Sequence, residues 1–511
     1  MSTLGGGPPL DEGDLPVAIP EPVDPADVDR SKVGTDEWVA RVEERRSAQK
    51  GISGLIARTW ERTPAFGRLV ILLGPFAIFP FITNEGNLFR YGLITIIYAL
   101  LAMGLNVVVG FAGLLDLGYV AFFGFGAYVY AFLSGSHHEK GHVYTHHWSA
   151  QYSILTAVVV CAVLGLFLGS SSRRLLGDYL AIVTLFFGQA FVVFTNSADP
   201  YGITNGSNGL GNIDPLRFSA FGLHFTVDTT RGYYWFLLGC VVLVLIIVHL
   251  LSESRTGRAW KASREDPLAA ELMGMPVNRL KIMAFSFGAA IAGLAGSVFA
   301  AAQTGAFPQN FGTQVLILIY AVVILGGAGS LTGMLAGATA IIVSFQVLDS
   351  TSPPNNARTL FYLGLIVGVV MLFKKSRVQM AVAVASTVAL GFAVHAIAEA
   401  VWPRGTSGHV TSGGYLTDAI KHWVLLPTHA NRLAVYGYLA LVVLAITIVQ
   451  LKGWWRVAVV PPTLVLTTFV WENLLIQQPA VTRFVLFGVL LITLMATRPQ
   501  GLFGTAKVEI V

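Results

Sequence analysis

The sequence contains little charge. Asp, Glu, Lys and Arg make up 12% of the 511 residues, against roughly 25% in an ordinary soluble domain, and hydrophobic residues make up 54%. A chain with so few charged groups cannot give several soluble domains a hydrated surface. The apolar residues also come in runs about as long as the hydrocarbon core of a bilayer is thick. We therefore predict an all-α fold, a polytopic transmembrane helical bundle.

Several kinds of chemical site are also missing from the sequence. The two cysteines, Cys161 and Cys240, lie in apolar runs, which argues against a disulfide framework or a cysteine metal site. There is no GxxxxGK[ST] phosphate loop, so a nucleotide cradle would have to belong to another chain. No convergent set of His, Asp, Ser or Cys indicates a membrane enzyme. The net charge of +5 is spread between the apolar runs, so we expect no nucleic-acid partner.

The apolar runs predict about 11 to 14 membrane crossings. They cover residues 68–83, 90–110, 113–134, 150–169, 178–196, 232–251, 281–303, 312–326, 330–348, 358–373, 378–401, 433–451, 456–475 and 482–497. Some runs are short, and Gly-rich joints at 110–113 and 326–329 separate others. We therefore expect some spans to be broken or re-entrant.

Lys and Arg gather mainly in alternate loops between these runs. The loops predicted to lie inside include the one that carries Arg255, Arg258, Lys261 and Arg264. Because cytoplasmic loops collect Lys and Arg, we predict a multi-pass protein of the inner (cytoplasmic) membrane, surrounded by membrane lipid, with both termini in the cytoplasm. The first apolar run begins near Arg68, after a long polar leader, so no cleavable signal peptide is expected.

One inner loop, residues 252–281, contains the pattern of a short capped helix. Asp266 is a good N-cap, Pro267 suits the first helical position, and Gly274 can end the helix. The helix formers between them are Ala269, Ala270, Glu271 and Leu272. A short cytoplasmic helix with an apolar face docks on something. The partner is either another protein, the chain's own bundle or the lipid surface.

Five sequence blocks follow one another in the order that a known protein family shows. They are GLNVVVGFAGLLDLGYVAFFGFGAY (104–128), GDYLAIVTLFFG (177–188), GRAWKASREDPLAAELMGMPVNRLKIMAFSFGAAIAGLAG (257–296), VLILIYAVVILGGAGSLTGMLAGA (315–338) and RFVLFGVLLITLMATRPQGLFG (483–504). These blocks resemble the LivM-type permease subunit of branched-chain amino-acid ABC transporters. The charged loop resembles the EAA-type loop of ABC importers, whose short coupling helix fits a cleft on an ATP-binding subunit.

The resemblance implies a permease subunit with no enzymatic activity, which forms half of the pathway of an ABC importer for branched-chain or similar small amino acids. It implies a sister permease subunit, two ATP-binding subunits that bind ATP and Mg, and an extracytoplasmic substrate-binding protein. The chain itself is expected to bind no cofactor. The expected ATPase-coupling residues are Glu265, Asp266, Pro267, Ala269, Ala270, Glu271, Leu272 and Gly274.

The resemblance also divides the chain. Residues 1–66 are expected to form a disordered leader and a cytoplasmic or interfacial helix, and residues 67–348 the permease core with its coupling loop at 252–281. Residues 349–479 insert extra transmembrane spans, and 480–511 form the family's C-terminal helix and tail. We expect the insertion to pack peripherally, with Glu399, Glu472 and Asn473 snorkelling at span ends.

Glycines and two polar residues are candidates for the translocation pathway. They are Gly113, Asp116, Gly118, Gly124, Gly126, Gln189, Gly326 and Gly327. Unwound segments at such glycines expose helix ends to a zwitterionic substrate, although close helix packing is the ordinary explanation. Asp116 is either a functional contact or a residue at the level of the membrane interface.

The substrate is less certain than the transporter class. Gln189 stands where relatives tend to carry Glu, and Asn-Gly-Ser-Asn-Gly at 205–209 replaces a Gly-Gly-Pro-Asn-Gly turn. A urea or short-amide permease of the same family is therefore the alternative. A secondary transporter is a more distant one, and it would carry buried ionisable pairs inside its spans. The histidines at 137–147 could hold a metal, but a solvated, unstructured loop is the preferred interpretation.

Overall fold

The computed structural model describes most of the helical part of the chain. The described residues are 65–139, 142–171, 177–197, 204–220, 223–347, 354–373, 376–408, 421–427, 431–451 and 453–475, with the single residues Phe484, Gly488 and Gly501. The predicted leader lies outside this range except for the start of α3 (Ala65–Ile82). The predicted helix within 480–511 also lies outside it, apart from the three single residues.

The prediction of an all-α, polytopic membrane bundle is confirmed. Within the described residues, eight helices are long and apolar enough to cross a membrane, and five further apolar helices are shorter. The first part, which we call the core (85–347), contains α4 (Glu85–Asn87), α5 (Ile94–Leu105), α6 (Tyr119–Leu133), α7 (Ala150–Ser171), α8 (Gly177–Asn196), α9 (Thr230–Glu253), α10 (Arg255–Glu265), α11 (Pro267–Leu272), α12 (Val277–Gln303), α13 (Thr313–Gly326) and α14 (Leu331–Val347).

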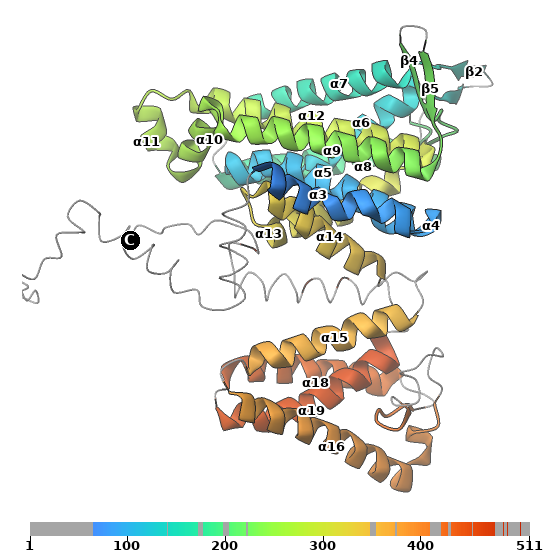
Figure 1. Cartoon of the computed structure of the whole chain (residues 1–511), viewed down its shortest axis with the longest axis vertical. Coiled ribbons are helices and arrows are strands. Elements are labelled where there is room, and N and C mark those ends of the chain that lie inside the picture. Colours follow the sequence, from blue (N-terminus) through green and yellow to red (C-terminus); the bar gives the residue numbers. More distant parts are fainter. Residues whose placement is uncertain are drawn as a thin grey trace, which may run out of the picture. The chain divides into compact units, whose positions relative to one another are not determined.

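Helix α12 lies at the centre of the core and packs against α5, α6 and α7 (Figure 1). Small residues let α6 and α12 approach closely. A Cβ added to Gly126 would lie 2.4 Å from the carbonyl oxygen of Gly293, and one added to Gly296 would lie 2.0 Å from that of Phe123. This is the packing expected between helices in lipid, where close backbone contact replaces the hydrophobic effect.

The chain unwinds at both of the predicted Gly-rich joints, and at the second it turns back between α13 and α14, which pack side by side. The span that begins at α4 runs through two π-helical stretches, η2 (Leu88–Leu93) and η3 (Asn106–Phe111), and then unwinds before α6. In the unwound segment Gly113 has a φ of +70°. Between α13 and α14, Gly327 and Gly329 have φ values of +94° and +92°, which side chains with a Cβ rarely adopt.

Short strands and turns lie between the helices of the core. The hairpin β1–β2 (Ser136–Glu139 and His142–Thr145) occupies the predicted unstructured histidine loop, so that part of the prediction is wrong. A second hairpin joins β4 (Leu216–Ala220) and β5 (Leu223–Val227). The two-residue strands β3 (Leu210–Gly211) and β6 (Gly305–Ala306) also pair, and η4 (Gly206–Asn208) and η5 (Pro308–Phe311) are short 3-10 turns. The hairpins lie at the end of the core opposite to α10 and α11 (Figure 1).

The second part, which we call the C-terminal helix group (354–475), contains α15 (Pro354–Leu372), α16 (Arg377–Val401), η6 (Pro403–Gly405), α18 (Asn431–Gln450), α19 (Trp454–Val470) and η7 (Trp471–Leu475). Helix α19 packs against both α16 and α18. Phe373, Ala383, Val457 and Val460 form a buried apolar cluster in this group.

Two polar residues of this group do not snorkel, contrary to the prediction. Glu472 is 2% exposed, and one of its carboxylate oxygens lies 2.7 Å from Nη2 of the buried Arg358. Asn473 is also buried, and its amide donates hydrogen bonds to the carbonyl groups of Leu425 and Phe469. The sequence placed both residues near a span end, where water is close, but the chain folds over that end and supplies partners instead. Glu399 is exposed at the end of α16.

Candidate functional site

The predicted short helix is present as α11, with both predicted caps. The carboxylate of Asp266 accepts hydrogen bonds from the amides of Leu268 and Ala269, each at 2.9 Å, which satisfies two of the donors left free at a helix start. At the other end, Gly274 has a φ of +80°. The amide of Gly274 donates to the Glu271 carbonyl at 2.9 Å, and that of Met275 to the Ala270 carbonyl at 3.0 Å. This is the Schellman pattern of helix termination.

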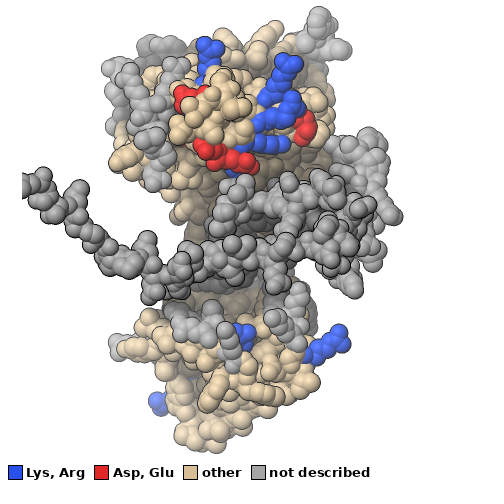
Figure 2. Space-filling view, turned by 90° about the vertical axis from the view of Figure 1, so that its left-hand side faces the viewer, with Lys and Arg blue, Asp and Glu red and all other residues tan. Residues whose placement is uncertain are grey.

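Helix α11 presents an apolar surface to solvent. Leu268, Leu272 and Met273 are 67%, 81% and 82% exposed. Charged side chains gather around this end of the core (Figure 2). Of the predicted coupling residues, only Ala270 is buried, at 3% exposure, so its side chain is not available to a partner.

Helix α10 joins this exposed element to the core. Trp260 is 1% exposed, and its indole N–H donates a hydrogen bond to the carbonyl of Leu280 at 2.8 Å. The ammonium of Lys261 lies 5.9 Å from the ring centroid of Phe111, within the range of a cation–π contact. The hydroxyl of Ser254 caps the helix by accepting the Gly257 amide. Helix α10 is therefore capped at its start by Ser254 and fixed to the neighbouring helices through Trp260 and Lys261.

Arg264 connects the loop to the first glycine joint. Its guanidinium donates a hydrogen bond to the carbonyl of Gly110. A Cβ added to Gly113 would lie 2.6 Å from the Arg264 side chain, so only glycine leaves room for it. The second joint meets the first, because the amide of Gly329 donates to the side-chain oxygen of Asn106 at 2.7 Å. The loop of 252–281 and the two glycine joints thus form one connected set.

Asp116 lies in the unwound segment that follows the first joint and is fully buried within the protein. One carboxylate oxygen accepts the Gly118 amide at 3.0 Å, and the other has no hydrogen-bond partner among the residues that the structure describes. The hydroxyl of Tyr320 accepts the Asp116 amide at 3.1 Å and donates to the Asp116 carbonyl at 2.7 Å. The Leu117 amide donates to the Thr184 hydroxyl at 2.9 Å. These bonds satisfy backbone groups that the break leaves unpaired.

Most of the other candidate glycines lie at close helix contacts. An added Cβ would lie 2.2 Å from the Thr184 carbonyl at Gly118, 2.2 Å from the Phe191 ring at Gly124, and 2.3 Å from the Gly333 carbonyl at Gly326. Packing therefore accounts for these glycines and for Gly126.

Gln189 is exposed on α8. Its side-chain amide donates a hydrogen bond to the hydroxyl of Thr313, at the start of α13, at 2.6 Å. This polar pair occupies a helix surface that is otherwise rich in exposed apolar side chains, such as Phe186 and Val193. The structure thus places Gln189 on an outer surface of the core, whereas Asp116 lies in its interior.

Three residues of this set were not predicted from the sequence. Arg264 counted only as a positive charge of an inner loop, and Asn106 and Tyr320 belonged to apolar runs. A polar side chain next to a glycine joint would have been a usable indication for Asn106, because an unwound backbone needs hydrogen-bond partners.

Long apolar helices, two glycine joints stabilised by polar side chains, and a capped helix joined to them define a multi-pass helical membrane protein. A family model described as the permease component of branched-chain amino acid transport systems matches residues 87–373, more than half of the chain. The chain belongs to this family, and the predicted LivM-type resemblance is confirmed.

Individual relatives agree with the family. The chain is 34% identical over 328 residues to the high-affinity branched-chain amino acid transport permease LivM of Salmonella typhimurium and of Escherichia coli, covering 60% of this chain and 73% of each relative. It is 26% identical over 250 residues to LivH of Escherichia coli, covering 47% of this chain and 78% of LivH. No solved structure matches the chain.

Proposed function

We propose that the chain forms half of the translocation pathway of an ABC importer for branched-chain or similar small amino acids. The names of its relatives support the substrate class, and its similarity to both LivM and LivH supports pairing with a related sister permease. ATP and Mg would bind to two separate subunits, and an extracytoplasmic binding protein would deliver the substrate. The chain would lie in the inner membrane with both termini in the cytoplasm.

The observation that carries this proposal is the exposed apolar surface of α11. Leu268, Leu272 and Met273 keep most of their surface in solvent, although burying such side chains is worth about 1.5–3 kcal/mol each. Caps at both ends hold the helix in shape without a partner. A preformed apolar helix at the cytoplasmic end suits a cleft on a motor subunit.

Arg264 would transmit a movement of the docked helix α11 to the helix bundle. When the ATP-binding subunits move α11, α10 moves with it, because only Asp266 separates the two helices. The guanidinium of Arg264 then displaces or releases the carbonyl of Gly110, at the break in the first span. The glycine joints allow the segment around Asp116 to change conformation, as a hinge of the pathway would require.

The pathway itself would pass along the unwound segment of 112–118. Gly113 leaves room for the arginine, and the unpaired carboxylate oxygen of Asp116 is a candidate acceptor for the ammonium of an amino acid. Gln189 would contribute from the surface that faces the sister permease.

Reconstituted transport tests this proposal. Proteoliposomes would contain the chain, its sister permease, the two ATP-binding subunits and the binding protein, and uptake of leucine, valine and urea would be measured with and without ATP. We expect ATP-dependent uptake of leucine or valine, abolished by Leu268→Asp with Leu272→Asp. Asn278→Asp is the control for added negative charge, because it adds one such charge at an exposed position in the first turn of α12. Uptake of urea alone would contradict the substrate class, and uptake unaffected by the double change would contradict docking through α11.

A further inference from the structure

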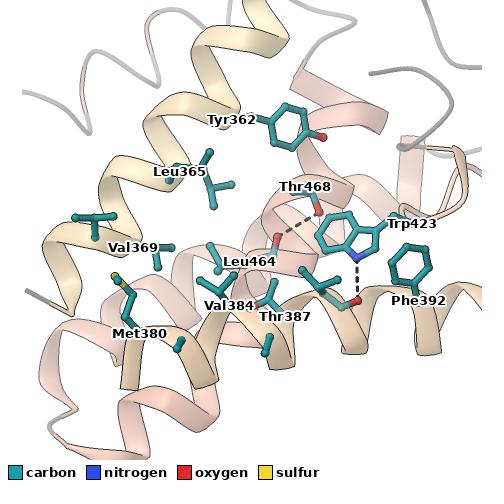
Figure 3. A pocket seen from close by; sticks show the side chains of 15 residues that line it. Tyr362, Leu365, Val369, Met380, Val384, Thr387, Phe392, Trp423, Leu464 and Thr468 are labelled. Atoms are coloured by element: carbon teal, nitrogen blue, oxygen red, sulfur yellow. Dashed lines mark hydrogen bonds between the residues drawn. The ribbon is translucent and has the colours of Figure 1, made fainter. Parts of the chain in front are cut away.

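An apolar groove runs through the C-terminal helix group. It encloses about 870 Å³ between α15 and α16, with α19 as its floor (Figure 3). Its walls include Leu365, Val369, Met380, Val384 and Leu464. The few polar atoms at its edge are already bonded within the chain, as with the Thr468 hydroxyl and the carbonyl of Val465 at 2.8 Å. The groove therefore offers carbon surface and no free polar group to an occupant.

Both ends of the groove are closed by side chains. At one end the indole N–H of Trp423 donates to the carbonyl of Val388 at 3.1 Å, and Phe392 lies beside it (Figure 3). At the other end Val369 and Met380 pack on the buried cluster that contains Phe373. The open side carries apolar side chains that remain about half exposed, including Val388 and Phe392. The shape suits a chain-like apolar occupant of limited length.

The position of the groove indicates what fills it. Helices α16 and α19 are among those long and apolar enough to cross a membrane, so the groove lies at the depth of the hydrocarbon core. An empty apolar cavity is costly because its lining loses dispersion contacts. At this depth acyl chains are the apolar molecules at hand.

Positive charge near the end of the groove that Met380 closes indicates which lipid headgroup would bind there. Arg377 is exposed at the first position of α16, three residues before Met380, and Arg456 lies at the start of α19, beside Val457 of the same cluster. The sequence has no Asp or Glu between 373 and 398 or between 433 and 471. Figure 2 shows Lys and Arg but no Asp or Glu on the visible face of this helix group. Basic sites at the membrane surface next to helices favour anionic lipid.

We propose that this groove binds one acyl chain of an anionic phospholipid, with its phosphate held by Arg377 and Arg456. The lipid would hold α15 and α16 at a fixed separation along the groove, between the closed end at Val369 and Met380 and the end at Trp423. A helix of another protein subunit is the rival occupant.

Native mass spectrometry of the purified complex tests this site, with phosphatidylglycerol and phosphatidylcholine of identical acyl chains as probes. We expect about tenfold stronger retention of phosphatidylglycerol than of phosphatidylcholine by the unmodified protein. Val384→Trp fills the groove and should abolish the difference. Ile397→Trp, exposed on the same helix and outside the groove, is the matched control and should keep it. Arg377→Gln with Arg456→Gln should bring both lipids to equal retention, whereas Arg404→Gln should not.

Three results would overturn the proposal. Equal retention of the two lipids by the unmodified protein would exclude recognition of the headgroup. Unchanged selectivity in Val384→Trp would exclude the groove as the site, and the arginine variants decide the matter if that variant does not fold. Cross-linking of Val384→Cys to another subunit would show that protein covers the groove.

Discussion

Polar side chains inside the core and inside the C-terminal helix group have different kinds of hydrogen-bond partner. In the core, Asp116, Asn106 and Arg264 bond mainly to backbone amides and carbonyls at two glycine joints. In the C-terminal helix group, Arg358 and Glu472 bond to each other through two guanidinium nitrogens, and the Tyr362 hydroxyl donates to the same carboxylate at 3.3 Å. Backbone partners at a joint can be exchanged when the joint moves, whereas a bidentate ion pair fixes one arrangement.

Under the proposed function, the glycine joints of the core would move during transport, whereas the ion pair of the C-terminal helix group would not. A buried ionisable pair inside a span is the feature that a secondary transporter would carry, and the structure does contain one. The pair joins α15 to η7, so Arg358 lies within the matched residues 87–373 and Glu472 lies beyond them. A tight pair with a third hydrogen bond suits a structural role in the C-terminal helix group.

Removing the charge of Glu472 would break the ion pair of the C-terminal helix group. Glu472→Gln leaves the buried Arg358 without its counter-ion, and we expect a loss of about 3–5 kcal/mol in unfolding free energy. Denaturant unfolding in detergent measures it, with the exposed Glu399→Gln as control, expected within about 0.5 kcal/mol of the unmodified protein. Uptake per folded molecule should not change. A variant that folds normally but transports nothing would instead give the pair a functional role.

Variants of Arg264 test the proposed link between the loop and the first glycine joint. Arg264→Ala removes the bond to Gly110, and we expect amino-acid uptake to fall by about 5- to 150-fold, the range of ordinary coupling energies. Assembly and ATP hydrolysis should persist, because α11 is untouched. Arg264→Lys keeps one charged donor and should recover part of the uptake. Arg258→Ala, which loses a bond to the Glu253 carbonyl on the exposed side of α10, is the control. An equal loss of uptake in Arg264→Ala and Arg258→Ala would contradict a specific role for Arg264.

Gly274 tests whether α11 must be preformed. Its φ of +80° and the open space around it mean that an added side chain meets only backbone strain, of roughly 1–2 kcal/mol for alanine. We expect faster amide exchange in α11 and weaker binding of the ATP-binding subunits in Gly274→Ala. Gly274→Asn should do less, since asparagine tolerates this conformation. Unchanged exchange in the alanine variant would refute the argument.

Asp266 gives the smallest expected effect. Asp266→Ala removes the acceptor of two amide bonds at the start of α11 and should destabilise that helix by about 1 kcal/mol. Asp266→Asn should restore it, because asparagine caps equally well. Amide exchange of Leu268 and Ala269 measures both variants, and a defect shared by the asparagine variant would indicate that the charge matters instead of the cap.

Sequence patterns predicted the features that local chemistry determines. Asp266, Pro267 and Gly274 act within a few residues of themselves, and the glycine joints need only their own backbone conformation, so both predictions are confirmed. The contacts that connect distant segments were not predicted. Arg264 and Gly110 are 154 residues apart, and Arg358 and Glu472 are 114 apart. The sequence shows that such side chains exist, but only the packed bundle shows which of them meet.

Cross-linking from α11 tests the central claim most directly. Cys161 and Cys240 are both buried, so Leu272→Cys would place one accessible thiol on the exposed face of α11. In the assembled complex, a short thiol cross-linker should join this position to an ATP-binding subunit, with a yield that changes when ATP is added. Phe167→Cys, at an exposed position on α7, should give no such product. A Leu272→Cys thiol that is accessible only from outside the membrane, or that joins no nucleotide-binding partner, would contradict the account.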